Sequence, residues 1–427
     1  MLEEILKRQN VEYAMLQVER NKGVGGVDDM QTDELRAYIN ANYQQLRQEV
    51  LSGKYTPDAV KKKEIPKPQG GVRMLGIPTV KDRLIQQAIS QWLNQFYEPN
   101  FSEFSYGFRP NRNAHQAVLQ ALTYLNEGYE YVIELDLEKF FDKVNHDKLM
   151  SLVMRKVTDK ATLRLIRQYL RSGIMEGGVV SQRIEGTPQG SPLSPLLSNI
   201  ILDELDKELT SRGHKFVRYA DDCSIYVKSE KAANRVLESI TKYIEEDLKL
   251  KVNKEKSKVS NPAESTLLGF TFYKEGGSWS IGIASKSIKR IKDKSRKLTQ
   301  RSDGSNTKQK IQKITPVVRG WVQYFSIARA FAENTMKDLD GFVRVRLRMG
   351  LWKAWKNCRT RAKNLIKLKA GRQRSYEWGY SSKGACRIAH SPVLSTTLNN
   401  AYSTKEGYEG FNNTYLRITK HTQIPLF

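Results

Sequence analysis

Two adjacent carboxylates interrupt a short run of strand-forming residues, FVRYADDCSIYV, between Phe216 and Val227. The β-rich segments on either side of Asp221 and Asp222 predict a tight hairpin with both acids at its turn. Neighbouring carboxylates repel each other unless a cation neutralises them, and Mg²⁺ prefers carboxylate oxygens together with substrate phosphates. For this pair alone, a solvated Asp-Asp turn is the simpler interpretation.

A third carboxylate, Asp136, ends an apolar, β-branched run that begins at Tyr131, 85 residues before Asp221. Three converging carboxylates can hold two divalent ions about 3.5–4 Å apart, which activate a hydroxyl and stabilise the departing oxygen of an in-line displacement. No Cys/His cluster and no Ser–His pairing in the sequence offers a competing kind of site. The residue context therefore favours two-metal chemistry over a solvated turn.

Several sequence blocks occur in a characteristic order: NKGVGGVDDM (21–30), LDLEKFFD (135–142), TPQGSPLSP (187–195), YADD (219–222) and RGWVQYF (319–325). In that order they resemble the signature blocks of reverse transcriptases, and specifically of the bacterial group II intron-encoded reverse transcriptase/maturase. The resemblance implies an α+β right-hand polymerase. Its fingers and its palm, with an antiparallel sheet and the YADD hairpin, would be followed by an α-helical thumb, called domain X in maturases.

The resemblance also implies the activity and its cofactors. An RNA-directed DNA polymerase of this family adds deoxynucleotides to a primer 3′-hydroxyl with two Mg²⁺ ions, for which Mn²⁺ can substitute, and assists splicing and mobility of its parent intron. Asp136, Asp221 and Asp222 match the catalytic metal ligands, and Leu137 would add its backbone carbonyl. The expected partners are an RNA template with a DNA or RNA primer, deoxynucleoside triphosphates, the parent intron RNA and target DNA.

Four residues are expected to bind the incoming nucleotide. Lys67 and Arg73 flank the turn of a β-hairpin predicted over 61–78 and match family positions that bind the triphosphate; a solvated cationic edge is the alternative. Phe141 matches the family's steric gate, a bulky ring that rejects the 2′-hydroxyl of ribonucleotides. Gln189, in a rigid loop rich in Pro and Gly, is expected to hydrogen-bond the nucleotide sugar or base.

Nine residues are expected to contact nucleic acid. The Gly-rich loop near the N-terminus resembles an extension that lies on the template, with a plain connector as the alternative. Two arginines of an aromatic loop are placed either on template phosphates or on neighbouring rings. Lysines of segment 248–259 are expected along the duplex, and arginines of a basic helix are expected to grip an A-form backbone. The set is Gly23, Gly25, Arg109, Arg112, Pro192, Lys256, Lys258, Arg344 and Arg348.

Positive charge is concentrated toward the C-terminus. The 427 residues carry a formal net charge of +25, and from Gly276 onward 31 Lys and Arg stand against 8 Asp and Glu, which leaves +2 for residues 1–275. Aromatic residues interleaved with this charge favour nucleic acid over a membrane surface or an acidic protein. We therefore expect binding that weakens steeply with salt.

Cysteine usage and hydropathy indicate the compartment. Cys223, Cys358 and Cys386 form no CxxC pair, which fits a reducing cytosol and excludes a zinc ribbon or the Cys/His endonuclease domain of many relatives. No run of about 18 apolar residues and no apolar signal core is present. We expect a cytoplasmic bacterial protein, nucleoid-associated when acting on DNA and most similar to the compact group IIC subclass, for which cutting its own target strand is not expected.

Apolar periodicity predicts the elements that position these residues. Strands are expected at the acids, with helices between them, and basic helices follow in the C-terminal third. Helices are predicted over 1–50 with a Gly-rich interruption, 80–98, 113–126, 147–172, 196–209, 231–248, 287–301, 311–329 and 338–368.

The shift in composition near Gly276 and the resemblance together imply four regions along the chain. These are an N-terminal extension with fingers (1–80), a fingers/palm core (81–275), a helical thumb (276–369) and a small basic and polar DNA-binding region (370–427) with little periodicity.

Two other functions stay open on the sequence. One is an RNA-binding splicing factor with a vestigial polymerase site, although the presence of all three acids argues against decay. The other is a reverse transcriptase of a defence or diversity-generating system, against which the maturase-like RGWVQYF segment argues. Primer extension distinguishes the first from a polymerase.

Overall fold

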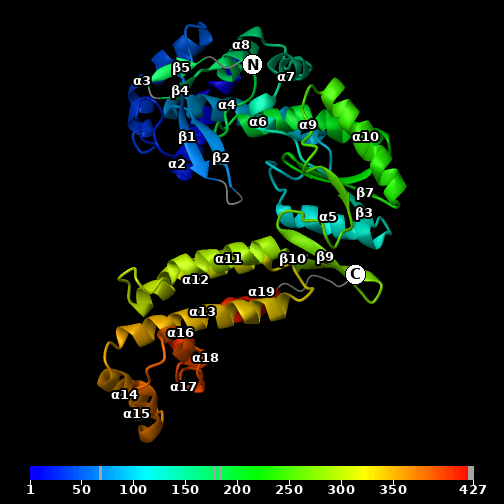
Figure 1. Ribbon diagram of the computed structural model, residues 1–427. Coiled ribbons are helices and arrows are strands. Elements are labelled where there is room, and N and C mark those ends of the chain that lie inside the picture. The colour runs from blue at the N-terminus through cyan, green and yellow to red at the C-terminus, as the bar shows by residue number, and fades with distance from the viewer. Residues whose placement is uncertain (67–69, 177, 182–183, 422–427) are drawn as a thin grey trace. The chain divides into compact units, whose positions relative to one another are not determined.

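The computed structural model describes residues 1–66, 70–176, 178–181 and 184–421. The chain divides into two compact units, Met1–Asn261 and Pro262–Phe427 (Figure 1). This division falls earlier than the boundary expected near Gly276. That glycine lies in the turn of a hairpin whose first strand packs Phe270 against helix α12 (Thr307–Phe325) of the second unit. Within the described residues, no helix is long and apolar enough to cross a membrane.

The first unit begins with helices that share one core. Ile5, Met15 and Ile39 are fully buried together with Ile89 of α4. The helical prediction for 1–50 is confirmed, with the expected Gly-rich interruption between α2 and α3. The elements are α1 (Leu2–Ile5), α2 (Arg8–Asn21), α3 (Leu35–Leu51), α4 (Val80–Tyr97), the 3₁₀ turn η1 (Glu98–Asn100) and α5 (Ala114–Asn126).

A four-stranded sheet of order β2-β1-β4-β5 carries the predicted hairpin. β1 pairs antiparallel with β2, and Val60 of β1 lies parallel to Ile174 of β4. The β4–β5 hairpin was not predicted, because three-residue strands are too short to show alternation. The strands are β1 (Val60–Pro66), β2 (Val72–Ile77), β4 (Ile174–Glu176) and β5 (Val179–Ser181).

A second sheet, of order β6-β7-β3-β8, has only antiparallel pairings, as expected for the palm. Helix α10 contacts β3, β7 and β8, and α5 and α9 contact β6 (Figure 1). Ile133, Phe216 and Ile225 are fully buried in the core that results. The bounds are β3 (Tyr131–Leu135), α9 (Ser194–Ser211), β6 (Lys215–Tyr219), β7 (Asp222–Val227), α10 (Glu230–Glu246) and β8 (Lys258–Ser260).

The helix predicted over 147–172 is two helices, α7 (His146–Val153) and α8 (Lys160–Arg171). Asp159 starts the second one, because its carboxylate accepts hydrogen bonds from the first amides of α8. The short helix α6 (Phe140–Lys143) precedes both and follows the Asp136 strand end.

The second unit consists of one β-hairpin and a set of helices. The third basic helix, predicted over 338–368, ends at Ala354, and Asn357 caps a new helix. Residues 370–421 form short helices, the last of which contacts α12 and α13. The bounds are β9 (Phe270–Glu275), β10 (Ser278–Ile283), α11 (Ser285–Leu298), α12 (Thr307–Phe325), α13 (Ala332–Ala354), α14 (Cys358–Lys367), α15 (Arg372–Gly379), α16 (Ala385–Ala389), α17 (Pro392–Thr397), α18 (Asn400–Lys405) and α19 (Phe411–His421).

Candidate active site

The palm sheet brings the three predicted acids to one end. β3 pairs with β7 so that Leu135 lies opposite Cys223, and the next step of this register places Asp136 across from Asp222. Asp221 lies in the two-residue turn between β6 and β7. Acids far apart in the sequence therefore share one edge of the palm.

A buried polar network supports the turn that carries the acids. Arg218 pairs with Asp206 of α9 through two hydrogen bonds of 2.6 and 2.7 Å and donates to the Ala220 carbonyl at 2.9 Å. Asn199 accepts from Arg218 at 3.1 Å and donates to the Gly107 carbonyl at 3.0 Å. Ala220 has a φ of 57°, a left-handed conformation that costs about 1–3 kcal/mol for a residue with a Cβ. These contacts hold the turn in that conformation.

Sequence reasoning missed this network, although one signal was present. Asn199 and Asp206 are polar residues seven apart on α9, which places both on one helix face. Gly107 must be a glycine because a Cβ there would lie 2.1 Å from the Ala220 nitrogen. This requirement can be recognised only after folding.

Repulsion among the acids is visible in their proton affinities. Asp222 keeps contact with solvent, yet its surroundings raise its pKa to about 6, through desolvation first and then through the charges of Asp221 and Asp136. Desolvation and Asp136 also raise the pKa of Asp221, against a lowering effect of Arg73. A divalent cation would relieve this repulsion, so the donor set suits a hard metal ion.

The carboxylates do not form a closed ligand set. Within the described ranges, no group of three or more His, Cys, Asp or Glu side chains is gathered tightly enough to hold a metal ion. The Asp136 carboxylate instead lies 3.5 Å from Lys256 Nζ. Leu137 is buried and bridges to Val252 across the strand end. The chemistry and the register of the acids fit a metal site, whereas their side-chain positions do not yet form one.

The fingers hairpin supplies a cation near the acids. Arg73 lies on β2 and is exposed, and its charge acts on Asp221. Gly76 of the same strand donates its amide to the Gln189 carbonyl at 2.9 Å, which ties the Pro- and Gly-rich loop to the hairpin. Lys67, the other predicted triphosphate ligand, lies outside the described residues.

Phe141 is held between its neighbours in the chain and the same loop. Its ring is half-buried and lies edge-on to Phe140, with centroids 5.2 Å apart. Its carbonyl accepts from the Thr187 amide at 2.6 Å. These contacts fix the backbone of the predicted steric gate.

The two arginines of the aromatic loop make contacts within the protein, and their predicted contacts with template phosphates remain predictions. Arg109 is buried, pairs with Glu98 at 2.9 Å and donates to the Ser105 carbonyl at 2.8 Å. Arg112 donates to a backbone carbonyl and lies over the Tyr106 ring at 5.6 Å. Packing against aromatic rings, the alternative interpretation, is what the structure shows.

The two α13 arginines are also engaged inside the second unit. Arg344 lies 3.6 Å from the buried Asp340 and over the Tyr408 ring. Arg348 donates to the Leu398 carbonyl at 3.0 Å. These side chains fasten the C-terminal helices to α13, and the predicted duplex contacts of both remain predictions.

The N-terminal glycines fit closely against the protein. A Cβ at Gly23 would lie 2.4 Å from the Arg83 guanidinium, and one at Gly25 would lie 2.8 Å from the Met30 carbonyl. Arg83 itself donates to the Val24 carbonyl. The loop is therefore docked on the start of α4, and its predicted contact with the template remains a prediction.

The remaining residues that are predicted to contact nucleic acid are at least partly exposed. Pro192 is half-buried just before α9. Lys256 and Lys258 are 64% and 55% exposed and lie near Asp136 and Glu134, the second pair at 3.6 Å. Their exposure leaves both lysines able to contact a duplex.

Comparison with known proteins identifies both parts of the chain. Residues 65–272 match the family Reverse transcriptase (RNA-dependent DNA polymerase), and residues 288–368 match Group II intron, maturase-specific domain. Protein YkfC of Escherichia coli (strain K12) is 34% identical over 272 residues, which cover 55% of this chain and 71% of YkfC. Group II intron-encoded protein LtrA of Lactococcus lactis subsp. cremoris is 36% identical over 217 residues, which cover 50% of this chain and 36% of LtrA.

Among solved structures, a telomerase from Candida albicans in complex with a fragment of telomeric RNA is similar over 78% of this chain and 67% of its own, with a TM-score of 0.43 and 14% identity. The family assignment rests on the sequence matches. The reverse transcriptase match encloses the whole palm sheet and the three acids, in keeping with the divalent metal ions that this family uses. The chain therefore belongs to the reverse transcriptases, in the group whose members are encoded by group II introns and carry a maturase domain.

Proposed function

We propose that this chain extends a primer 3′-hydroxyl on an RNA template and acts as the maturase of a group II intron. The observation that supports this most directly is the strand register, in which Asp136 follows Leu135 and comes across from Asp222, beside Asp221 in the turn. These acids, with the Leu137 carbonyl, would hold two Mg²⁺ ions. Such ions activate the attacking hydroxyl and stabilise charge on the leaving pyrophosphate.

The chain's own residues would bind and select the nucleotide. Arg73 and Lys67 are proposed to bind the triphosphate, and the influence of Arg73 on Asp221 supports a position beside the acids. Phe141 would exclude a 2′-hydroxyl, and Gln189 would contact the sugar or base. The hydrogen bond from the Gly76 amide to the Gln189 carbonyl ties this loop to β2, which supports such a contact.

The maturase role would use the second unit. Because Arg344 and Arg348 are engaged, we assign duplex and intron RNA binding to the exposed cations of α11. Arg290 and Lys294 of that helix line a cavity of about 670 Å³ together with Trp321 of α12. Cations beside an aromatic ring are typical of surfaces that bind nucleic acid.

Primer extension on poly(rA)/oligo(dT) tests the polymerase. Asp222→Asn should abolish extension, with a loss of at least about 1,000-fold, while leaving RNA binding largely intact. Glu238→Gln, an exposed carboxylate of α10, removes the same charge elsewhere and should leave the rate unchanged. If the unmodified protein extends no primer with Mg²⁺ or Mn²⁺, the splicing factor with a vestigial site is the better description.

A further inference from the structure

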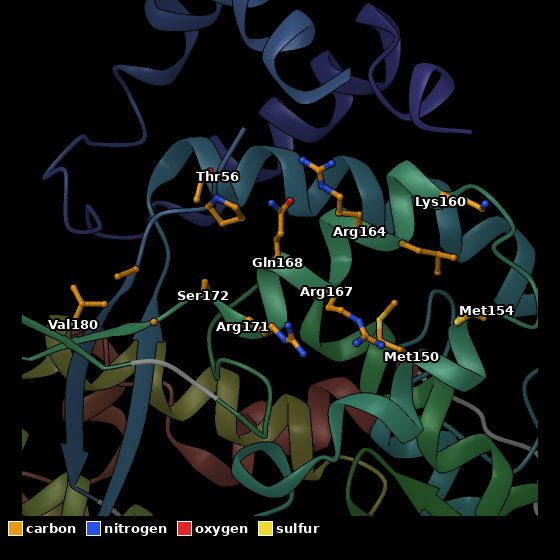
Figure 2. A pocket seen from close by; sticks show the side chains of 14 residues that line it. Thr56, Met150, Met154, Lys160, Arg164, Arg167, Gln168, Arg171, Ser172 and Val180 are labelled. Carbon is orange, nitrogen blue, oxygen red and sulfur yellow. The ribbon is translucent and has the colours of Figure 1, made fainter. Parts of the chain in front are cut away.

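A cavity of about 670 Å³ lies in the first unit and shares no residue with the candidate active site (Figure 2). It is bounded by α7, α8, β5 and the segment before β1. None of its lining residues is acidic, although the first unit as a whole is almost neutral. Its four cations all come from α8: Lys160, Arg164, Arg167 and Arg171.

The spacing of these cations places them on one face of the helix. Steps of four, three and four residues keep all of them within an arc of about 60°, along roughly 16 Å of helix axis. No acid follows Asp159 in α8, so nothing on the helix neutralises this face. Such a row of charge suits a ligand with several anionic groups in succession, as in a nucleic-acid strand.

The cations differ in how strongly the protein engages them. The Arg164 side chain extends away from those of Arg167 and Arg171 (Figure 2) and donates to the Gly53 carbonyl. Arg167 lies 3.3 Å from Asp147, a carboxylate that is 83% exposed, and such exposed pairs contribute only about 0–1 kcal/mol. In the described chain Lys160 and Arg171 make no ion pair. Arg167 and Arg171 extend to the same side of α8 (Figure 2).

Apolar groups stand beside these cations. Met154 is 55% exposed, and the buried Met150 lies next to Arg167 (Figure 2). Val180, which is 51% exposed, lines the opposite end of the cavity from Met154 (Figure 2). A thioether is polarisable and makes favourable contacts with aromatic rings. The cavity thus offers cations for phosphates and an apolar surface for a flat ring.

We propose that this cavity binds an unpaired nucleotide of an RNA strand, with the neighbouring phosphates on Arg167 and Arg171 and the base against Met154. An acidic peptide would satisfy the cations but would leave the exposed apolar surface without a flat partner. The choice of RNA rests on the proposed function, because a maturase must hold its intron RNA at sites outside the polymerase centre. The cavity would be one such site.

The test uses the full-length protein with a saturating unlabelled RNA–DNA duplex of mixed sequence, fully paired, to fill the polymerase site. The probe is a 12-nucleotide fluorescein-labelled oligouridylate that carries 4-thiouridine. Arg167→Gln/Arg171→Gln should raise its Kd at least about 10-fold and flatten the slope of log K against log salt by about 1.4, since each lost phosphate contact on a single strand is worth about 0.7. The matched control Lys231→Gln/Arg235→Gln removes two exposed cations, also four residues apart, from α10 and should change the Kd by less than about twofold.

Two further measurements locate the probe. Irradiation should cross-link it to the peptide that contains Met154, and Met154→Glu should weaken binding as the double variant does, because it places an anion at the apolar rim. An equal loss in the α10 control, a cross-link confined to other peptides, or equally effective competition by an oligoglutamate of the same length would each overturn the proposal.

Primer extension separates this inference from the proposed function. Arg167→Gln/Arg171→Gln should extend oligo(dT) on poly(rA) at the unmodified rate, because the cavity contains none of the polymerase residues. A protein that binds the probe in the cavity but never extends a primer would refute the proposed polymerase activity, while the proposed RNA site in the cavity would be supported. A double variant that loses extension in step with probe binding would show that these arginines serve the polymerase centre, and would overturn the proposal of a separate site.

Discussion

Arg218 connects the turn that carries Asp221 to the core of the palm. It is fully buried, and its charge is matched by Asp206, which is also fully buried. The same guanidinium donates to the Ala220 carbonyl, inside the turn that carries Asp221. Removing one member of a buried ion pair leaves an uncompensated charge, whereas replacing both with apolar residues of similar volume is often tolerated. The two kinds of substitution therefore separate stability from positioning.

We expect Arg218→Met to lower the free energy of unfolding by about 3–5 kcal/mol, measured by urea denaturation. Arg218→Met/Asp206→Leu should recover much of that stability, because no charge stays buried. The rate of primer extension should remain low in the double variant, since the Ala220 carbonyl still lacks its donor. A double variant with both stability and full extension would show that the turn needs no such support.

A second prediction at the scale of one residue concerns sugar selection. Phe141→Ala removes the ring that is proposed to collide with a 2′-hydroxyl, so the ratio of kcat/KM for deoxynucleotide over ribonucleotide should fall by about 10-fold or more. Single-nucleotide primer extension with dTTP and UTP measures that ratio. An unchanged ratio, with extension otherwise intact, would remove Phe141 from the role of gate.

Helix α4 is fixed at its first turn by a carboxylate that is almost fully buried. Asp82 accepts hydrogen bonds from the Tyr55 hydroxyl at 2.7 Å, the Thr79 hydroxyl at 2.8 Å and the Asp58 amide at 3.1 Å. Its pKa is nevertheless raised to about 6, because desolvation outweighs these bonds. An acid with a raised pKa in the folded state stabilises the fold at low pH and loses that contribution as pH rises through about 6.

Asp82→Asn should therefore gain stability relative to the unmodified protein as pH rises. A shift from 3.8 to about 6 predicts a change of roughly 1.4 kcal/mol in this difference between pH 5 and pH 8. Urea denaturation of both proteins at the two pH values measures it. A difference that does not change with pH would mean that Asp82 titrates normally in the fold.

Long, strongly periodic elements could be predicted from the sequence, and short or context-dependent ones could not. α4, α5 and α10 and the hairpin of β6 and β7 match their predicted ranges closely, because each carries a continuous apolar pattern. The break between α7 and α8 depends on one capping aspartate inside a pattern that otherwise continues.

The candidate site divides in a similar way. The order of its motifs identified the three acids, and the register places them at one sheet edge. The roles of Arg109, Arg344 and Arg348 could not be predicted, because only tertiary packing supplies the carboxylates and carbonyls that engage them. The sequence around an arginine does not show whether its guanidinium will be paired within the protein.

At the scale of the whole molecule, the division of the chain also divides its charge. Residues 262–427 contain 32 Lys and Arg against 10 Asp and Glu, so nearly all of the net charge belongs to the second unit. Each unit has a core of its own, and Phe270 and Phe272 of β9 are fully buried. A fragment that ends after β9 would therefore carry this strand without its partner β10, whereas a fragment that ends before β9 would not.

A fragment of residues 1–261 should fold and remain monodisperse, whereas a fragment of residues 1–275 should aggregate, because β9 would expose two phenylalanines and an unpaired edge. Size-exclusion chromatography distinguishes the two.

The 1–261 fragment should also bind an RNA–DNA duplex far more weakly than the full chain does. Its slope of log K against log salt should be less steep, because most phosphate contacts are assigned to the second unit. Retention of the full affinity and the full slope by residues 1–261 would place the duplex grip in the nearly neutral unit and contradict the assignment to α11.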